Sequence, residues 1–339
     1  MKTSGWKKTW IQTDRGERVE AIAPVIISAS RATDIPAFYA DWFMHRLKTG
    51  YCQWINPFNQ QPQYISFQET RAIVFWSKNP APMIKYLPDL DQQQINYYFT
   101  CTVNDYEHEG LEPGVPPLKN RLETFIRLAG LIGKDRVIWR FDPLVLTDRI
   151  SIDTLVEKIR RIGDQLHPCT NKLVISFADI TAYRKVQNNL KKSGINYRPF
   201  SEAAMNEIAE KLQRLNQNWH LTIATCAEAI NLEKYGIINN KCIDDDLMIK
   251  CFSSDKKLMD FLDWPPIEAD LFAAGRRTAE QPSLKDPGQR AACGCIRSKD
   301  IGQYNTCMHL CAYCYANTTP EIVKNNYAQR QRFADSILK

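Results

Sequence analysis

Short apolar runs that end in polar residues recur along the first two thirds of the chain. Seven runs have the length of a buried strand, and they lie at residues 25–28, 51–55, 72–76, 97–102, 136–139, 173–177 and 221–225. Runs of four to eight apolar residues are typical of strands covered on both faces. The pattern therefore predicts seven strands of a buried sheet.

Between these runs, apolar residues recur every three or four positions, which is the spacing of one helix face. Six segments show this spacing: 37–48, 80–87, 118–132, 152–166, 182–192 and 202–215. Alternation of strands and helices predicts parallel strand pairing with right-handed crossovers. We therefore predict an α/β fold of the TIM-type (β/α) barrel kind, complete or partial, with a doubly wound open sheet as the alternative.

The pattern changes at both ends of the chain. Residues 11–13 and 19–21 flank a turn-forming stretch, so residues 1–24 are expected to form a hairpin. Strand-helix units fill residues 25–235. The alternation then fades, and residues 236–339 form a cysteine-rich segment that returns to a helical pattern at 320–338. We expect this segment to complete or cover the barrel.

The polar residues that close the apolar runs are the first candidates for chemistry. In a parallel barrel they meet at the carboxyl ends of the strands. Arginines at such ends are costly unless they meet an anion. A simpler role as a helix cap or turn former is open to each residue, as for Asp34 before Pro36. The catalytic candidates are Arg31, Asp34, Lys78, Arg140, Asp142 and Glu228, and Thr33, Asn56, Asn79 and Asp179 are expected at the same edge.

Composition is that of an ordinary globular protein, with 44% hydrophobic and 24% charged residues. No apolar run approaches the roughly 20 residues that cross a bilayer. The charged residues 1–8 precede no apolar core of signal-peptide length. We therefore expect a cytoplasmic protein without membrane contact. In a long chain of this kind, eleven cysteines indicate metal ligands rather than a disulfide framework.

Three of the cysteines, Cys307, Cys311 and Cys314, form a C-x3-C-x2-C triad near the C-terminus. Three thiolates leave one iron of a four-iron cluster without a protein ligand, and that iron can hold a reactive molecule. The alternative is a structural zinc site with Cys295 as the fourth thiolate. Because C-x2-C pairs dominate zinc knuckles, the spacing favours an open [4Fe-4S] cluster.

Four further cysteines form a second group. Cys226 closes the last predicted strand, Cys242 follows it, and Cys293 and Cys295 form a C-x-C pair before the triad. Four thiolates suffice for a closed iron-sulfur cluster or for tetrahedral zinc. The alternative is that Cys226 and Cys242 are small buried hydrophobes. The remaining cysteines lack such neighbours and are predicted to be packing residues: Cys52, Cys101, Cys169 and Cys251.

The triad resembles the signature of the radical S-adenosylmethionine (SAM) superfamily. The resemblance implies that the open iron binds the amino and carboxylate groups of the cofactor, whose reductive cleavage gives a 5'-deoxyadenosyl radical that abstracts hydrogen from a substrate. Tyr313 matches the aromatic residue that the superfamily places against the adenine, and Tyr315 and Asn317 are further cofactor-binding candidates. A small-molecule substrate and an electron donor such as flavodoxin or ferredoxin are implied with it.

The triad stands in the last tenth of the chain, whereas in the superfamily it usually follows the first barrel strand. Three explanations are open. The order of units is permuted in space, the triad lies on a lid over a complete barrel as in the thiamine pyrimidine synthase, or the cluster only transfers electrons or stabilises the fold. No Gly-Gly-Glu segment follows a second strand. Together with the triad, residues 27–36, 75–80, 139–143 and 298–304 resemble an uncharacterised bacterial family that is defined by this cysteine cluster and supplies no substrate.

Charge adds two alternatives. Residues 275–339 carry ten Lys or Arg against five Asp or Glu, a balance that can attract nucleic acid. A triad followed by tyrosine also resembles the spore photoproduct lyase, so a nucleic-acid repair lyase is one alternative. The other is a non-catalytic barrel with structural zinc or iron-sulfur sites that binds an anion through Arg31 and Arg140.

Overall fold

A computed structural model describes residues 5–264 and 284–338 of the chain. The predicted segments 1–24 and 236–339 therefore lie only in part within the described residues. The main sheet has eight strands in the order β13-β12-β10-β8-β7-β6-β3-β14, and every neighbouring pair is parallel. The bounds are β3 Ile26–Ala29, β6 Ala72–Ser77, β7 Asn96–Thr102, β8 Val137–Leu144, β10 Lys172–Phe177, β12 Thr222–Thr225, β13 Ile237–Asn239 and β14 Lys299–Asp300.

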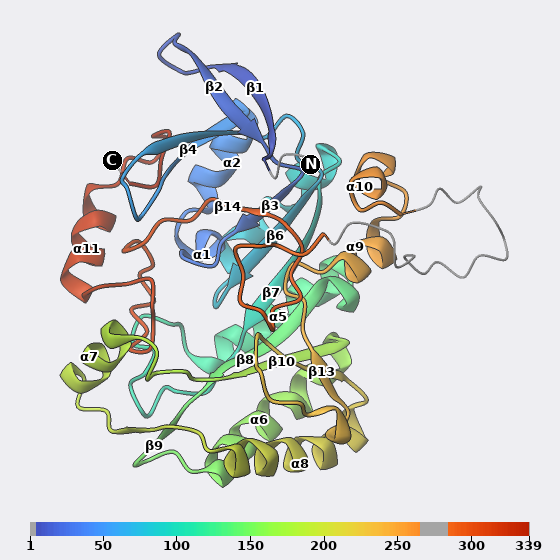
Figure 1. Ribbon diagram of the computed structural model, residues 1–339, viewed down its shortest axis with the longest axis vertical. Helices are drawn as coiled ribbons and strands as arrows, with labels where there is room; N and C mark the ends of the chain where they lie inside the picture. Colours follow the sequence, from blue (N-terminus) through green and yellow to red (C-terminus); the bar gives the residue numbers. More distant parts are fainter. Residues whose placement is uncertain (1–4, 265–283, 339) are drawn as a thin grey trace, which may run out of the picture.

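The strands succeed one another across the sheet in chain order, except that the last strand, β14, lies beside the first, β3 (Figure 1). Asp300 of β14 fixes this contact, because its carboxylate accepts hydrogen bonds from Ser28 Oγ at 2.9 Å and Ser30 Oγ at 2.7 Å. The edge strands β13 and β14 are short and do not pair with each other. The described strands thus form an open parallel sheet and not the complete barrel that was one of the expectations.

One predicted strand belongs elsewhere. Residues 51–55 form β4 (Tyr51–Ile55), which pairs antiparallel with β5 (Pro62–Ser66) in a second sheet of order β1-β2-β5-β4. The strands β1 (Lys7–Gln12) and β2 (Arg18–Ala23) make the antiparallel hairpin of this sheet. The turn after β4 reverses the chain, so Asn56 caps a hairpin turn and does not line the expected edge of the parallel sheet.

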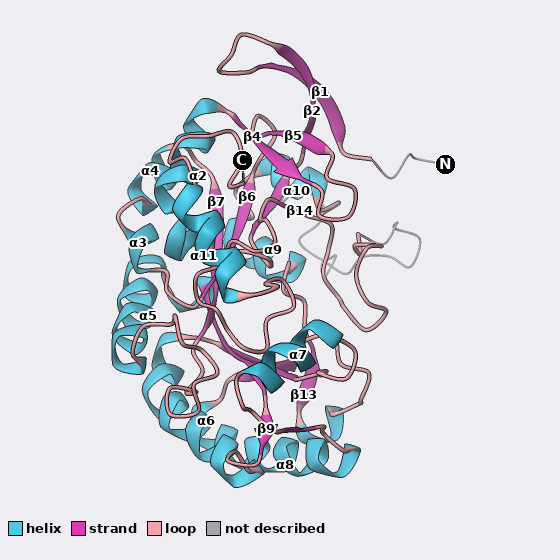
Figure 2. Cartoon of the chain, turned by 90° about the vertical axis from the view of Figure 1, so that its left-hand side faces the viewer, coloured by secondary structure: helices cyan, strands magenta, loops and turns pink. Residues whose placement is uncertain are grey.

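Helices cover one face of the parallel sheet (Figure 2). The predicted segments 118–132 and 152–166 coincide with α5 and α6, because Pro117 and Gly133 bound the first and Ser151 caps the second. The helices are α1 Ile35–Phe38, α2 Ala40–Thr49, α3 Ala81–Ile84, α4 Leu87–Gln92, α5 Leu118–Ile132, α6 Ile152–Leu166, α7 Arg184–Lys192, α8 Glu202–Trp219, α9 Asp245–Phe252, α10 Lys256–Phe261 and α11 Pro320–Gln329. Short 3-10 turns lie at Lys134–Arg136, His167–Cys169 and Glu233–Tyr235, and β9 (Leu146–Thr147) pairs with β11 (Tyr197–Arg198).

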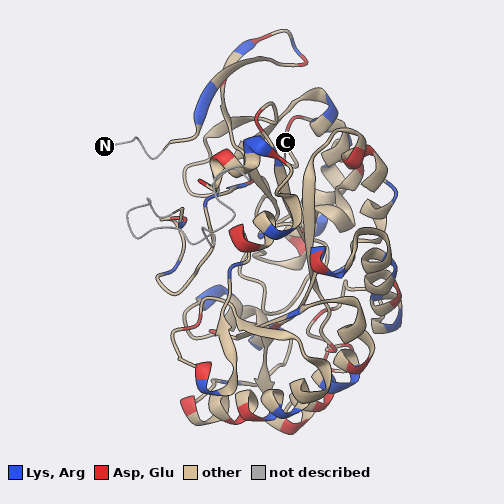
Figure 3. Ribbon diagram, turned by 90° about the vertical axis from the view of Figure 1, so that its right-hand side faces the viewer, with Lys and Arg blue, Asp and Glu red and all other residues tan. Residues whose placement is uncertain are grey.

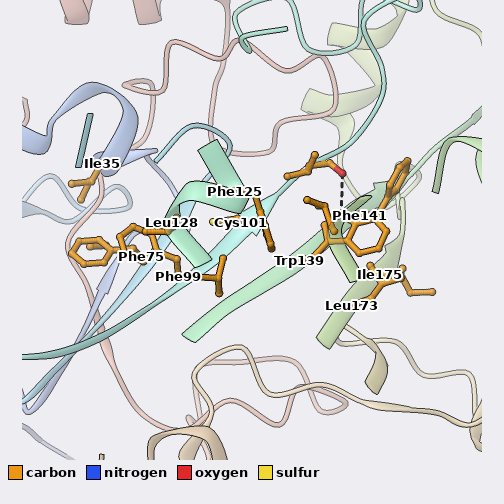
Figure 4. Packing of buried hydrophobic residues seen from close by; sticks show 14 of the residues in the cluster. Ile35, Phe75, Phe99, Cys101, Phe125, Leu128, Trp139, Phe141, Leu173 and Ile175 are labelled. Carbon is orange, nitrogen blue, oxygen red and sulfur yellow. Dashed lines mark hydrogen bonds between the residues drawn. The ribbon is translucent and has the colours of Figure 1, made fainter. Parts of the chain in front are cut away.

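The main core lies between the sheet and these helices. Alternate strand residues such as Phe75, Phe99 and Trp139 face Phe125 and Leu128 of α5 (Figure 4). The indole N–H of Trp139 is satisfied by the carbonyl of Val103 at 3.1 Å. Burial of this many large side chains, at about 1.5–3 kcal/mol each, fixes the positions of the strand ends.

The opposite face of the sheet packs against a different segment. Val74, Tyr98 and Ile138 contact the stretch that begins at Cys242 and continues through α9 and α10. The Tyr98 hydroxyl donates to the Cys242 carbonyl at 2.7 Å and accepts from the Asp244 N–H at 3.0 Å. Side chains therefore fill this face, and the carboxyl ends of the strands stay open.

The surface and the C-terminal tail complete the fold. Lys and Arg alternate with Asp and Glu along the outer helices, as in the Arg160 to Asp164 pair of α6 (Figure 3). The predicted helix 320–338 ends at Gln329, because the tail then turns back and its Asp335 binds the buried Arg46 of α2 at 3.1 Å. No described helix has the length and apolar content needed to span a membrane.

Candidate metal centres at the carboxyl ends of the strands

A cavity of about 530 Å³ opens where β3, β6, β8, β10 and β12 end. It brings together residues that lie far apart in the sequence, such as Arg31 and Tyr315, which are 284 positions apart. The predicted site residues that line it are Arg31, Asp34, Lys78, Arg140, Asp142, Glu228, Tyr313, Tyr315 and the seven cysteines of the two groups. Asn317 does not line the cavity, and its Nδ2 donates instead to the Cys307 carbonyl at 2.8 Å.

The triad forms one wall of the cavity on the loop that follows β14. Burial raises the pKa of Cys307 to about 12 and also raises the pKa of Cys311 and Cys314. As thiols these side chains are inert, so they act as ligands only when a positive metal replaces their protons. Cys295, the alternative fourth ligand, belongs to the other group, where its sulfur accepts from the Cys242 N–H at 3.2 Å.

His309 and Asp34 hold the triad loop in place. The His309 ring contacts Asp34 Oδ2 through Nε2 at 2.7 Å and the Gly114 carbonyl through Nδ1 at 3.2 Å. The Asp34 carboxylate also accepts from the Ser77 hydroxyl, the Lys78 N–H and the Ala37 N–H. Asp34 is therefore both the cap of α1 and a positioning residue for the loop.

Beside the triad, three side chains form a buried polar network. Lys78 Nζ lies 2.7 Å from Glu112 Oε1 and 3.0 Å from the Tyr313 hydroxyl, which also donates to Glu112. Burial alone would raise the pKa of Glu112, but the charges of Lys78 and Arg121 outweigh it and lower that pKa to about 2. The ionised pair locks the Tyr313 ring against the cavity wall.

The second cysteine group forms another wall. The sulfurs of Cys226 and Cys242 lie 3.4 Å apart, and the Cys242 and Ile243 N–H groups point at the Cys295 sulfur. The pKa of Cys242 lies well below its usual range because the Cys226 and Cys295 thiols and the Arg140 guanidinium favour its thiolate. Cys293 and Cys295 are buried with Cys242 in one apolar cluster. The fold thus assembles four sulfurs from three chain segments.

Two arginines border the second group, and both lie against the Trp76 indole. The Arg140 and Arg31 guanidinium carbons lie 5.2 Å and 5.5 Å from the centre of the Trp76 ring. Arg140 Nη1 donates to the Cys242 sulfur at 3.0 Å while its other nitrogens bind Asp142. Burial opposes the charge of Arg140, but Asp142 and the sulfurs raise its pKa well above its usual value.

Glu228, just after β12, also lines the cavity. Burial raises the pKa of Glu228 to about 7, although the Phe177 N–H donates to its Oε1 at 2.9 Å. Arg290 donates to the Tyr183 hydroxyl at 2.6 Å nearby. Glu228 is therefore able to gain or lose a proton near neutral pH, which a general acid or base requires.

A family model described as a domain of unknown function, DUF1848, matches residues 26–316. The chain belongs to this family. The matched residues run from β3 to the end of the triad loop, so the DUF1848 domain contains the whole parallel sheet and both cysteine groups. The expected membership of an uncharacterised family is confirmed, while its radical-SAM-like chemistry stays a prediction.

Other comparisons add little. A solved structure described as a putative alpha-L-fucosidase from Bacteroides thetaiotaomicron is 10% identical over 57% of this chain and 71% of that chain, with a TM-score of 0.25. Similarity at this level supports no statement about the DUF1848 domain. No curated protein matches the chain.

Among residues 5–264 and 284–338, seven buried side-chain atoms lack a hydrogen-bond partner; two are Arg46 Nε and Ser298 Oγ, and the other five lie around the two cysteine groups of the DUF1848 domain. Near the triad they are Glu112 Oε2 and Asn317 Oδ1, and near the second group they are Arg31 Nη2, Trp76 Nε1 and Asn240 Oδ1. Such atoms cost about 1–3 kcal/mol each unless a partner satisfies them. The two donors among them, Arg31 Nη2 and Trp76 Nε1, fit a wall that holds an anionic group such as a cluster, whereas the three oxygens need a donor.

Sequence reasoning missed several of these residues. His309 lies inside the triad motif, so its position between the cysteines was a usable signal. Glu112 lies on an irregular loop, as does Asn104, whose Nδ2 donates to Glu112 Oε1 at 3.0 Å, and Trp76 lies inside an apolar run; no local pattern marks these residues. Asp244, Asp245 and Asp246 also place carboxylate oxygens within 4.8 Å of one another, but Lys172 and Lys241 pair with this acidic cluster.

Proposed function

We propose that the chain is a radical SAM enzyme in which Cys307, Cys311 and Cys314 bind a [4Fe-4S] cluster. One observation carries the proposal: the three sulfurs share one wall of a cavity at the strand ends, while Cys295 and His309 are engaged elsewhere. Together the cluster and SAM would supply a 5'-deoxyadenosyl radical at this wall. Three thiolates suit this role because one iron keeps an exchangeable position.

The order of the strands supports a permuted, incomplete (β/α) barrel. In the superfamily the triad follows the first strand, and here it follows β14, an edge strand that pairs with β3. The unit made of β14, the triad loop and α11 then takes the place of the first unit, with β3 as the second strand. This interpretation removes the need for a lid over a complete barrel.

The chain's own groups have distinct roles in this proposal. The Lys78 and Glu112 pair fixes the Tyr313 ring where an adenine can stack. Arg31 and Arg140 supply positive charge for the carboxylate of a cofactor or substrate. Glu228, with its pKa of about 7, exchanges the proton that a change in the substrate would release or require.

The test is cofactor cleavage by the anaerobically reconstituted and reduced protein. We expect formation of 5'-deoxyadenosine by the wild type and a loss to background in Cys307→Ala. Cys169→Ala is the matched control, because that half-buried cysteine lies at the end of α6 away from the cavity, and it should keep wild-type turnover. Background cleavage by the wild type with a reduced cluster present would refute the proposal.

Metal analysis of the same protein separates the non-catalytic alternative. Zinc without sulfide in the wild type would favour structural sites. The nucleic-acid alternative rests on basic residues of which several are paired, as Arg332 is with Asp41 and Arg290 with Asp179. Faster SAM cleavage in the presence of a nucleic acid would support the nucleic-acid alternative.

A further inference from the structure

Cys226, Cys242, Cys293 and Cys295 come together only through the fold. Cys226 follows β12, Cys242 follows β13, and the C-x-C pair precedes β14. A backbone hydrogen bond from Ile296 to the Ile243 carbonyl at 3.1 Å holds the last two segments side by side. The group therefore spans the gap between the two edge strands that do not pair with each other.

Several hydrogen-bond donors point at the sulfurs of this group, as they do around the thiolates of iron-sulfur clusters. Cys242 Sγ accepts from Arg140 Nη1 at 3.0 Å and from Asn240 Nδ2 at 2.9 Å, and two backbone N–H groups point at Cys295 Sγ. A neutral thiol is a weak acceptor, whereas a thiolate is a strong one. Four thiolates at this wall would outweigh the nearby cations, because Arg140 shares its charge with Asp142 and Arg31 lies close to Asp300. Metal ions are the ordinary source of the missing positive charge.

We infer that these four cysteines bind a second iron-sulfur cluster, closed by protein ligands and separate from the triad. Zinc fits less well, because Zn–S bonds of about 2.3 Å would hold all four sulfurs about 3.8 Å apart. Within the described part of the chain, no three cysteine sulfurs lie within 4.8 Å of one another. In an iron-sulfur cluster the four thiolates are spread over more than one iron, so one close pair, such as Cys226 and Cys242 at 3.4 Å, fits with other sulfurs that stand farther away.

Two orphan donors on this wall also favour a cluster with sulfide. In the part of the chain that the structure describes, Trp76 Nε1 and Arg31 Nη2 are buried without an acceptor, and both side chains line the cavity. Inorganic sulfide accepts hydrogen bonds, and such bonds set the reduction potential of a cluster. A zinc ion saturated by four thiolates brings no acceptor of its own.

This inference stands on residues other than the triad, so it is testable whether or not the proposed function holds. The first experiment measures iron, sulfide and zinc in anaerobically purified Cys307→Ala/Cys311→Ala/Cys314→Ala protein. We expect about half of the wild-type iron, with sulfide in equal amount and no stoichiometric zinc. Zinc without sulfide, or no metal in a protein that still unfolds cooperatively, would overturn the inference.

The matching variant is Cys226→Ala/Cys242→Ala, which should lose the half of the iron that the triad variant keeps. If the inference holds but the triad binds no cluster, the wild type does not cleave SAM. The triad variant then contains as much iron as the wild type, and Cys226→Ala/Cys242→Ala contains none. The two failures therefore give different patterns of metal content.

A subtler variant avoids loss of the ligands. In the triad-free background, Arg140→Lys keeps the positive charge but removes a guanidinium N–H from the Cys242 sulfur, so the reduction potential and resonance spectrum of the remaining cluster should shift. Arg290→Lys is the control, because Arg290 lines the same cavity and its hydrogen bond goes to Tyr183. Equal resonance spectra and reduction potentials in the triad-free protein, its Arg140→Lys variant and its Arg290→Lys variant would contradict the assignment of the cluster to this wall.

Discussion

The two cysteine groups face one cavity, yet they are built in opposite ways. The triad lies on eight consecutive residues, and burial keeps its protons bound in the absence of metal. The second group comes from three segments, and donors already favour a thiolate at Cys242. The first arrangement suits a site that keeps one position open, and the second suits a site that the fold closes.

The supports of the two groups also differ. A loop contact through His309 and an ion pair through Lys78 hold the triad, whereas the second group sits in the apolar layer of α9 and α10. Changes to the polar supports should therefore affect the triad and spare the second group. Substitutions at these supports test the difference.

The largest effect is expected for Glu112→Gln. Loss of the buried carboxylate leaves Lys78 without its counter-ion and should cost about 3–5 kcal/mol of unfolding free energy. Because the pKa of Glu112 is lowered to about 2, its stabilisation is present above the unfolded value of about 4.3 and is lost as the pH falls toward 2. Urea unfolding at pH 7 and pH 3 measures both effects.

The control is Glu123→Gln on the exposed side of α5, for which we expect a change within about 0.5 kcal/mol. Iron in the triad should fall in Glu112→Gln and iron in the second group should stay. Equal loss of iron from the triad and from the second group would contradict the proposed difference in their supports.

Gly114→Ala should have the next largest effect. A Cβ at Gly114 would lie 2.2 Å from the Met308 carbonyl oxygen, so the triad loop would have to move. We expect a cost of about 1–3 kcal/mol and lower iron in the triad after reconstitution. Gly130→Ala meets no atom within 4 Å and should be neutral or slightly stabilising. Unchanged triad iron in Gly114→Ala would show that the loop is not held at this contact.

The smallest effect is expected for Glu228→Gln, and it depends on pH. Because burial raises the pKa of Glu228 to about 7, the stability that its neutral form provides is present below about pH 4.3 and is lost as the pH rises through 7. The variant should therefore gain stability over the wild type at pH 8 relative to pH 5, by about 1–2 kcal/mol after allowance for solvent screening. Paired thermal unfolding curves test this, and a difference independent of pH would contradict the raised pKa.

Much of the fold could be predicted from local patterns. All seven predicted runs are strands, and α5 and α6 have their predicted bounds because proline, glycine and serine mark their ends. The prediction placed residues 51–55, which form β4, in the wrong sheet, because an apolar run does not reveal which strand it pairs with. β13 and β14 have three and two residues, which is too short for any periodicity to show.

The candidate site divides in the same way. The triad is visible as a motif, and Arg31 and Arg140 are visible as charges after apolar runs. Contact between Cys226, Cys242 and Cys295 depends on the order of strands across the sheet, which no spacing in the sequence contains. The contact of Glu112 with Lys78 depends on the path of a long loop, which local conformational propensity does not predict.

In the proposed arrangement, one cavity joins an open cluster site to a closed one. Electron paramagnetic resonance of the reduced protein, recorded with and without SAM, distinguishes the two sites. We predict two cluster signals, of which SAM alters only the one that Cys307→Ala removes. A single signal, or a SAM-dependent change in the signal that Cys242→Ala removes, would contradict the account.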